Sequence, residues 1–386
     1  MQISLVVCSQ EVKVQDSILN HIKARALETH SDALIIRKDG TTIYEEYYGK
    51  EQAPMYIASA GKSLVSLAIG KLIDDKLLDS LNQPIYTIYP QWKQGKKKEV
   101  TVRMLLNHTS GIQNYPNASL ELEPPPEYKI ENIIELALAA ELSDIPGEKV
   151  NYNNKAVALL GGIIQKLSGK SFDSFFEINF FNPMNIKEYS WIKDKSGNPT
   201  VHGAFVIKPS DFIKFGELLL NKGIYNGERI ISEDWINESL KQSQDFTPIW
   251  GLLWWRLPEY ERRIIDDEIW ESWKEAKISE SFMNKMELIK GVLFESKVAF
   301  YNALKEVLGE SWIETLNANL SGDLKWSKKI YGDAIKAYYA EGYRGNYLVI
   351  IPKHNIVAVR CADFDGFNSK TDSYSEFVNL ISKLSQ

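Results

Sequence analysis

The sequence is poor in the residues from which disulfide frameworks and metal centres are built. Cysteine occurs only twice among 386 residues, as Cys8 and Cys361, so no disulfide framework is expected. The five histidines are dispersed, and none has the spacing of a zinc ligand relative to another histidine or a cysteine. The sequence therefore predicts no metal and no other cofactor, and it disfavours a metallohydrolase.

Long apolar runs and an excess of positive charge are missing as well. No apolar stretch reaches the length of about 18 residues that a membrane span needs, so no membrane-spanning helix is predicted. The formal net charge is −6, which provides no positive field for a polyanion, and nucleic acid is not an expected partner. The composition, 44% hydrophobic and 25% charged, is that of an ordinary globular protein with a sizeable core.

The first part of the chain alternates between strand and helix signals. Residues 33–49 contain two β-prone runs joined by Asp39 and Gly40, a pair that suits a tight hairpin turn. Residues 58–78 carry apolar side chains at the spacing of a buried helix face. From residue 100 to about 190 the pattern is mostly helical, with proline-rich and glycine-rich breaks.

The second part closes the sheet that the first part starts. A helix is expected after Ser210 and Asp211, with Gly223 ending it. Strands are expected at 346–351 and 356–360, and a closing helix at 374–384. We therefore predict an α/β (α+β) fold in which an antiparallel sheet is flanked by helices. Its domains would be a sheet domain from both chain ends, 1–99 and 200–386, and an inserted all-helical domain, 100–199.

A Ser-x-x-Lys pattern stands at the start of the expected helix 58–78, as Ser59 and Lys62. A hydrolytic serine needs a base within hydrogen-bond reach, because neutral serine is a weak nucleophile. Residues three apart share one face of a helix, so Lys62 would lie beside Ser59. The small residues between them, Ala60 and Gly61, would let a substrate approach closely. This pattern predicts Ser59 as the nucleophile and Lys62 as its partner.

The same pattern also occurs at Ser190 and Lys193, which shows that the pattern alone is weak. The neighbours of Ser190 are β-prone, and on a strand residues three apart point to opposite faces. Ser190 and Lys193 would therefore not meet. A nucleophile elbow of the α/β-hydrolase type is also disfavoured, because Ile57 stands where its first glycine would be.

A Tyr-x-Asn pattern supplies a second possible base. Tyr152 and Asn154 stand in a loop directly before a helix expected at 156–167, a rigid place for a catalytic group. A phenol oxygen held among cations can act as a base, and an asparagine amide can orient a substrate. A second copy, Tyr115–Asn117, lies in a long proline-rich loop. We prefer Tyr152 as the catalytic tyrosine.

In this order and at this spacing the motifs resemble those of class C β-lactamases and their relatives, including esterases and 6-aminohexanoate-dimer hydrolases. The resemblance covers most of 30–255 and 330–385, and its further motifs are Leu105–Ile112, Pro146–Gly147, Leu160–Ile164, Lys208–Gly216 and Tyr225–Ile231. It implies a β-lactamase/transpeptidase-like fold. It also implies attack by Ser59 on a carbonyl, proton transfer through Lys62 and Tyr152, and hydrolysis of the acyl-enzyme by water. Asn154 would contact the substrate, whereas His108 is expected to be structural, with its ring capping nearby backbone.

The sequence departs from the class C pattern at the strand that borders the site. A Lys-Thr-Gly motif is expected there, but residues 337–345 contain none and are more similar to the esterase and aminohexanoate-dimer hydrolase branch. The resemblance implies that the oxyanion hole would use the Ser59 N–H and an N–H near Tyr339 or Ala340. Arg344 is a candidate for binding a substrate carboxylate, and the alternative is a solvated turn arginine paired with Glu341.

Residues 262–329 form an insertion that such relatives do not need, and its composition predicts several helices. It could be a cap that selects the substrate, or else a helical layer or oligomer contact. The predicted function is hydrolysis of a small carboxylic ester or amide by an acyl-enzyme on Ser59. The alternatives are a true β-lactamase or D-Ala-D-Ala carboxypeptidase, and a penicillin-binding sensor that does not turn over. No signal peptide is evident, so a cytoplasmic location is expected, although many relatives are periplasmic.

Overall fold

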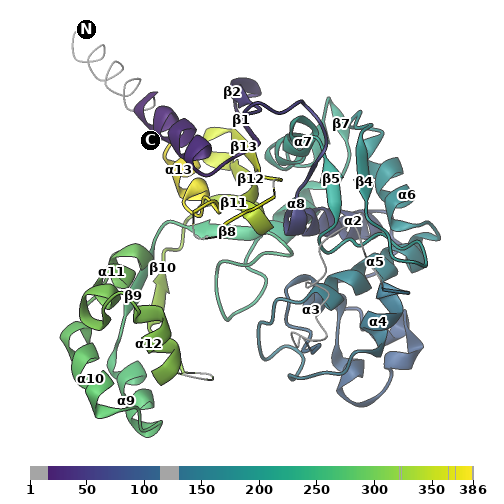
Figure 1. The fold of residues 1–386 in the computed structure, drawn as a ribbon. Helices are drawn as coiled ribbons and strands as arrows, with labels where there is room; N and C mark the ends of the chain where they lie inside the picture. The colour runs from purple at the N-terminus through teal and green to yellow at the C-terminus, as the bar shows by residue number, and fades with distance from the viewer. Residues whose placement is uncertain are drawn as a thin grey trace. The chain divides into compact units, whose positions relative to one another are not determined.

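A computed structural model of the chain describes residues 16–113, 130–320, 322, 324–363, 365–369 and 371–384. The chain divides into two compact units (Figure 1). Unit 1 comprises Met1–Leu257 and Lys336–Gln386, and unit 2 comprises Pro258–Ile335. Unit 1 contains every residue from which the sequence predicts a reaction site, and it is described first.

The main sheet of unit 1 has six strands in the order β2-β1-β13-β12-β11-β8. The recorded pairings of β1 with β2 and β13, and of β12 with β11 and β13, are all antiparallel. Asp39 and Gly40 join β1 to β2 at positive φ angles of 50° and 74°, as the tight turn requires. The strand bounds are β1 (Ala33–Lys38), β2 (Thr41–Glu46), β8 (Trp255–Pro258), β11 (Ile335–Gly342), β12 (Asn346–Ile351) and β13 (Ile356–Cys361).

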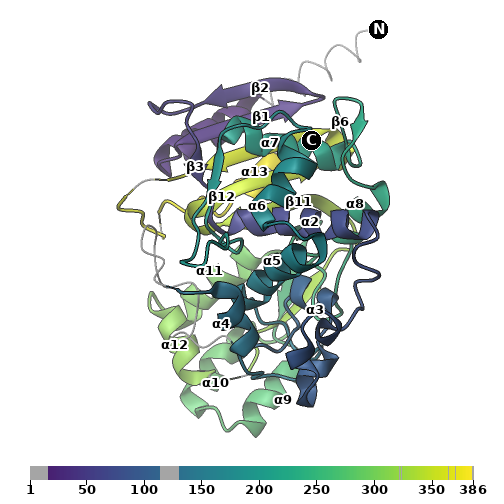
Figure 2. The ribbon, with the colours of Figure 1, turned by 90° about the vertical axis from the view of Figure 1, so that its right-hand side faces the viewer.

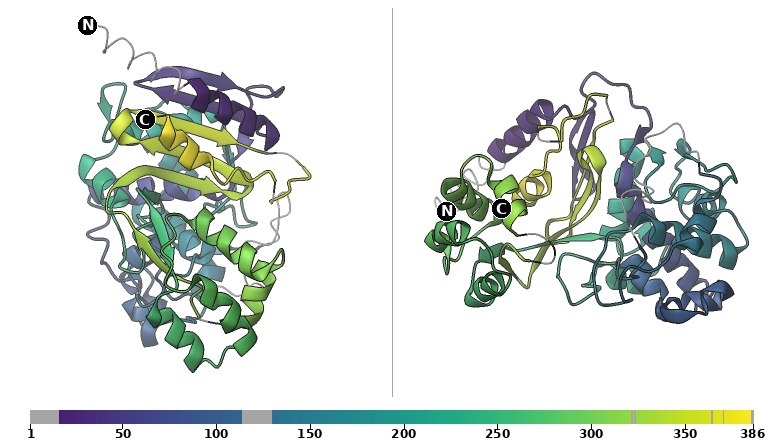
Figure 3. Two further views of the ribbon diagram at one scale, coloured as in Figure 1. Left: turned by 90° about the vertical axis from the view of Figure 1, so that its left-hand side faces the viewer. Right: turned by 60° about the horizontal axis from the view of Figure 1, so that its bottom comes forward.

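Helices cover both faces of this sheet, because its central strands are apolar on both sides. One face packs against the helical residues 16–28 and α13 (Phe377–Lys383), which lie side by side in Figure 3. The other face packs against α7 (Pro209–Leu220), where Gly216 lies directly over Val357 and leaves no room for a side chain. Such two-sided burial explains why β12 and β13 are buried at every position.

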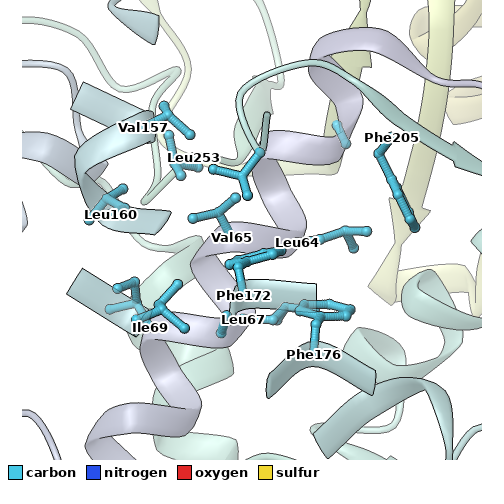
Figure 4. Close-up of a cluster of buried hydrophobic side chains, with 14 of the residues drawn as sticks. Leu64, Val65, Leu67, Ile69, Val157, Leu160, Phe172, Phe176, Phe205 and Leu253 are labelled. Atoms are coloured by element: carbon cyan, nitrogen blue, oxygen red, sulfur yellow. The ribbon is translucent and has the colours of Figure 1, made fainter. Parts of the chain in front are cut away.

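The helical part of unit 1 is built around α2 (Lys62–Asp74) and α5 (Asn154–Ser168), which pack against each other. Figure 4 shows Leu64 and Val65 of α2 beside Val157 of α5 and Phe172 of α6. One hydrophobic core runs continuously from these helices to the α7 face of the sheet (Figure 2). The other helices of this unit are α3 (Val102–Leu106), α4 (Ile133–Ala139), α6 (Phe172–Phe176) and α8 (Glu233–Leu240).

Two smaller sheets complete unit 1. A three-stranded antiparallel sheet has the order β3-β5-β4, and a two-stranded sheet pairs β6 with β7. Their bounds are β3 (Met55–Tyr56), β4 (Tyr189–Trp191), β5 (Phe205–Ile207), β6 (Ile224–Tyr225) and β7 (Glu228–Arg229). The β3 strand leads straight into the segment that carries Ser59.

Unit 2 has an antiparallel pair of strands and a helical core of its own. Strand β9 (Glu261–Ile264) pairs with β10 (Lys328–Tyr331), and four helices lie between them in the chain. Trp273, Phe300 and Leu304 are fully buried in this core. The helices are α9 (Asp267–Glu275), α10 (Glu280–Met286), α11 (Lys297–Leu308) and α12 (Trp312–Asn319). The sequence predicted the helices of this segment but missed the strands that frame them.

The predicted fold class is confirmed, with mixed helices and antiparallel sheets of the β-lactamase/transpeptidase type. Several helix boundaries differ from those expected. The helix expected over 58–78 is a 3₁₀ turn, η1 (Ala58–Gly61), followed by α2, which ends at Asp74. Helix α7 begins at Pro209, because proline suits the first helical position, and not after Ser210. The division into domains 1–99 with 200–386 and 100–199 stays a prediction.

Candidate active site

Ser59 lies in the 3₁₀ turn η1, one turn before α2 begins at Lys62. The residue before it, Ala58, has a positive φ of 49°, which is unfavourable for a residue with a side chain. The surrounding structure holds this conformation, since Ile57 and Ala58 are both buried. Ser59 itself stays partly exposed, so its hydroxyl is presented at the end of a buried helix.

Lys62 is buried, and its amine is held by two oxygen atoms. Nζ lies 2.7 Å from Ser59 Oγ and also donates a hydrogen bond to the carbonyl oxygen of His202. The Tyr152 ring lies on another side of the amine, with its centroid 4.9 Å from Nζ. The structure thus brings together the serine, lysine and tyrosine that the two sequence patterns single out.

Tyr152 is positioned by the residue that follows it. The side chain of Asn153 caps α5 by accepting a hydrogen bond from the Ala156 N–H, at 3.1 Å, and donates to the carbonyl oxygen of Ile112, at 2.7 Å. The backbone N–H of Asn153 donates to Nδ1 of His108, at 3.2 Å. Asn153 is completely buried, so these three bonds fix the backbone from which the Tyr152 ring projects.

His108 has the structural role that was expected of it. Its Nδ1 accepts the Asn153 N–H, which leaves the proton of the neutral ring on Nε2. Complete burial, and then the nearby Lys62 amine, lower the pKa of His108 to about 3. The ring is therefore neutral near pH 7, and it packs against Tyr152 with ring centroids 4.7 Å apart.

The pocket at Ser59 has an aromatic wall that the motifs did not identify. Trp250 and Trp255 lie with ring centroids 3.9 Å apart. Between them in the chain, Leu253 has a positive φ of 60°, and its carbonyl oxygen accepts a hydrogen bond from Ser63 Oγ at 2.6 Å. The cavity is small, about 10 Å³, and its lining residues are Ser59, Lys62, Ser63, His108, Tyr152, Trp250, Leu253, Trp255 and Glu341. The cluster of tryptophans at 250–255 is the sequence feature from which this aromatic wall could have been predicted.

The end of β11 borders the nucleophile through Gly342. A Cβ added to Gly342 would lie 3.1 Å from Ser59 N and 2.9 Å from Ala60 N. Gly342 is therefore the β11 residue that packs against the Ser59 backbone. Ala340 is buried in the core, and Tyr339 is on the opposite face, where its ring stacks on Trp255 at 6.1 Å.

The strand's oxyanion donor, expected near Tyr339 or Ala340, stays a prediction. The strand ends at Gly342, so an N–H near Tyr339 or Ala340 lies further back along β11 than the backbone beside Ser59. Neither of these two residues lines the cavity, whereas Glu341 does. The sequence could not reveal this, because the register of β11 against η1 depends on packing between segments almost 300 residues apart in the chain.

Arg344 and Asn154 are placed outside the cavity lining. Arg344 forms an ion pair with Asp363 at 3.0 Å, and it is not part of the cavity lining. Asn154 is the first residue of α5 and is buried, and its Oδ1 has no hydrogen-bond partner within the described ranges. Their roles toward a substrate stay predictions.

The second Ser-x-x-Lys pattern behaves as predicted. Ser190 is exposed on strand β4, and Lys193 forms an ion pair with Asp173 at 2.6 Å. The second Tyr-x-Asn pattern, Tyr115–Asn117, lies outside the described residues. Across the part of the chain that the structure describes, no group of His, Cys, Asp or Glu side chains could hold a metal ion. In the same residues, no helix has both the length and the apolar character needed to cross a membrane.

Comparisons with known proteins identify the family and the fold of the chain. The family described as Beta-lactamase matches residues 20–376 of the chain. Protein flp of Staphylococcus aureus strain N315 is 25% identical over 202 residues, which cover 49% of this chain and 40% of that protein. The chain thus spans less than half the length of this curated relative.

Two solved structures share the fold over nearly the whole chain. A candidate 6-aminohexanoate-dimer hydrolase from Bacillus anthracis is 18% identical with a TM-score of 0.61, covering 94% of this chain and 79% of that one. A class C beta-lactamase in complex with cefoxitin is 15% identical with a TM-score of 0.57, covering 97% of this chain and 99% of that one. At these identities the likeness shows the fold alone. The resemblance inferred from the motifs is confirmed.

Proposed function

The chain belongs to the Beta-lactamase family, and we propose that it is a serine hydrolase that cleaves a small carboxylic ester or amide through an acyl-enzyme on Ser59. The proposal is carried by the hydrogen bond of 2.7 Å between Lys62 Nζ and Ser59 Oγ, in a cavity that Tyr152 also lines. A serine held this way has the adjacent proton acceptor that nucleophilic catalysis needs.

In the proposed acylation, Ser59 Oγ attacks the substrate carbonyl carbon. Its proton passes through Lys62 and Tyr152 to the leaving group, whose bond to the carbonyl carbon breaks as the ester to Ser59 forms. Water then attacks that ester, releases the carboxylic acid and returns a proton to Ser59. The hydrogen bond between Lys62 Nζ and Ser59 Oγ supports the first transfer, and Tyr152 lines the same cavity.

Charge that develops on the carbonyl oxygen would be stabilised by backbone N–H groups. Ser59 N–H is one donor, and the backbone at the end of β11 would supply the other, since Gly342 packs against Ser59 N. Only glycine permits this approach, because a Cβ at residue 342 would lie 2.3 Å from the carbonyl oxygen of Ile57.

The lining of the cavity favours esters and amides over β-lactams and D-Ala-D-Ala peptides. Substrates of the latter kinds carry a carboxylate, and the expected Lys-Thr-Gly motif would bind it with a cation. Here β11 ends in Ala340, Glu341 and Gly342, and Glu341 lines the cavity. A carboxylate there would repel a substrate carboxylate.

The proposal can be tested with p-nitrophenyl butyrate, nitrocefin and a fluorescent penicillin. We expect steady turnover of the ester that is lost in Ser59→Ala. The matched control is Ser190→Ala, which removes the serine of the other Ser-x-x-Lys pattern from an exposed strand position and leaves turnover unchanged. Fast turnover of nitrocefin would instead favour a β-lactamase, and stoichiometric labelling by penicillin without turnover would favour a sensor.

A further inference from the structure

The turn that follows β11 is held by two buried polar side chains that the proposed reaction does not use. This turn, Tyr343–Gly345, joins β11 to β12, and Gly342 stands directly before it. Asn346 and Arg360 both contact the turn and are completely buried. Burying an amide or a guanidinium costs free energy unless its hydrogen bonds are formed, so the role of each follows from what it binds.

Asn346 is the cross-strand partner of Gly342, and its amide bridges two segments of the chain. Nδ2 donates to the carbonyl oxygen of Tyr343 at 2.7 Å and, less closely, to that of Ala362 at 3.3 Å. Oδ1 accepts the Ala362 N–H at 2.9 Å. The amide therefore ties the first residue of the turn to the residue that follows β13, the strand next to β12 in the sheet.

Arg360, on β13, holds the rest of the turn. Its Nη1 donates to the carbonyl oxygen of Arg344 at 2.8 Å and to that of Gly345 at 2.7 Å. Its other nitrogens donate to groups outside the turn, which are Ser31 Oγ and the carbonyl oxygens of Thr29 and Asp372. Asn346 and Arg360 thus bind the carbonyl oxygens of all three residues of the turn.

The backbone of the turn needs this support. Arg344 and Gly345 have consecutive positive φ angles of 70° and 71°, a conformation that is unfavourable for arginine. A Cβ at residue 345 would collide with the carbonyl oxygen of Ser373 and lie 2.5 Å from Arg360 Nη1, so only glycine fits there. Hydrogen bonds and packing, and not residue preference, therefore set the direction in which β11 ends and β12 begins.

The same turn determines how Gly342 meets the nucleophile. The position of a Cβ on Gly342 is 2.9 Å from Ala60 N and 3.1 Å from Ser59 N, so the two backbones are closer than a methyl group allows. A hydrogen bond to an oxyanion weakens steeply as its length and angle depart from the optimum. A looser turn would let the end of β11 move away from the Ser59 backbone while the rest of the sheet stays folded.

We propose that Asn346 and Arg360 are positioning residues of the oxyanion hole, which hold the carbonyl oxygens of the turn and so keep Gly342 packed against the Ser59 backbone. This inference rests on the proposed hydrolase function. Neither side chain contacts the substrate. Their effect is confined to the steps in which negative charge develops on the carbonyl oxygen, so they act on kcat and not on the binding of the substrate in its ground state.

Two substitutions would loosen the turn without removing it. Asn346→Ser removes the amide that binds Tyr343, and Arg360→Lys keeps the charge but lacks the planar fork of donors. For each we expect kcat for p-nitrophenyl butyrate to fall by about tenfold, less than for the loss of a whole oxyanion donor, with KM within about twofold. Ile351→Val, at a buried position at the other end of β12, is the matched control, which should lower the melting temperature and leave kcat unchanged.

A transition-state analogue distinguishes positioning from stability. A trifluoromethyl ketone with a butyl chain forms a bond between its carbonyl carbon and Ser59 Oγ, which places an oxyanion in the hole, and the serine proton passes to Lys62. The methyl ketone of the same length stays a ketone. We expect both variants to bind the trifluoromethyl ketone about tenfold more weakly than the unmodified protein does, and the methyl ketone equally well.

A measurement on the unmodified protein guards against variants that do not fold. The Ala362 N–H donates to Asn346 Oδ1, so it should exchange with deuterium as slowly as the N–H groups of β12, with or without the trifluoromethyl ketone. Faster exchange that only the ketone slows would show that the turn is not held in advance, which would overturn this inference.

The outcomes for the inference and for the proposed function differ. Unchanged kcat and unchanged affinity for the trifluoromethyl ketone in folded Asn346→Ser and Arg360→Lys would overturn the inference and leave the proposed function standing. Absence of ester turnover in the unmodified protein would overturn the proposed function.

Discussion

Gly342 and Ser59 are nearly 300 residues apart in the sequence, yet their backbones are in contact. A Cβ built on Gly342 would lie 3.1 Å from Ser59 N and 2.3 Å from the carbonyl oxygen of Ile57. The end of β11 therefore approaches Ser59 as closely as the chain permits, and both donors of the proposed backbone oxyanion hole would depend on that approach.

Gly342→Ala should reduce kcat/KM for a p-nitrophenyl ester by about 10²-fold or more, since the added methyl group displaces the strand from the Ser59 N–H. Gly40→Ala is the control. The backbone of Gly40 has a φ of 74°, which favours glycine, but no atom lies within 4 Å of the position that an added Cβ would take. The control should lower the free energy of unfolding by about 1 kcal/mol and leave kcat/KM unchanged. Equal kcat/KM in the two variants would contradict the close approach.

His108 should make the stability of the fold depend on pH in the acidic range. Its pKa is about 3 in the folded chain, against an ordinary value of 6.5, so the unfolded chain binds more protons between these values. The contribution of His108 to the free energy of unfolding is therefore fully present above pH 6.5. It is lost as the pH falls below that value, by up to about 1.4 kcal/mol for each pH unit. Urea unfolding at a series of pH values measures the slope.

His108→Asn separates this contribution from that of the carboxyl groups. An asparagine oxygen can still accept the Asn153 N–H but does not titrate, so the slope of stability against pH should become shallower below pH 6.5. His21→Asn, at an exposed position of the helical residues 16–28, should keep the original slope. The same slope of stability against pH in the unmodified protein, His108→Asn and His21→Asn would show that His108 is not buried as a neutral ring.

Arg344→Ala should have little effect on catalysis. The guanidinium is committed to Asp363, 3.0 Å away, and the side chain is not part of the cavity lining. We expect KM to be unchanged for both anionic and neutral esters, and the free energy of unfolding to fall by less than about 1 kcal/mol. A rise in KM confined to anionic esters would restore Arg344 as a carboxylate-binding residue.

Removal of the inserted segment tests whether it is a cap. Unit 2 has a hydrophobic core of its own, and at its base the Glu259 N–H donates to the carbonyl oxygen of Ala334 at 2.8 Å. Replacing residues 260–333 by a short glycine-containing turn should therefore give a chain that still folds and hydrolyses a short ester. We expect its preference among longer acyl groups to change, and an unchanged preference would contradict the cap hypothesis.

Much of the fold could be predicted from the sequence, because it depends on the preferences of residues that are close together in the chain. The turn at Asp39 and Gly40 and the strands expected at 346–351 and 356–360 follow from residue preferences and periodicity. Helix ends were less predictable. Ser59 was placed in a helix because residues 58–78 have the apolar spacing of one, but Ala58 has a positive φ and Ala58–Gly61 is a 3₁₀ turn. Such a conformation is imposed by packing and not by alanine itself.

The motifs alone were enough to predict Ser59, Lys62 and Tyr152 as candidates and to indicate the family, because they are short and lie in a recognisable order. Which distant segments complete the cavity depends on the tertiary structure. The wall of Trp250 and Trp255, the contact of Gly342 with Ser59 and the position of Glu341 all depend on strand register and loop packing. Register is set by the whole core, so no local pattern could reveal which residues of β11 line the cavity beside Ser59.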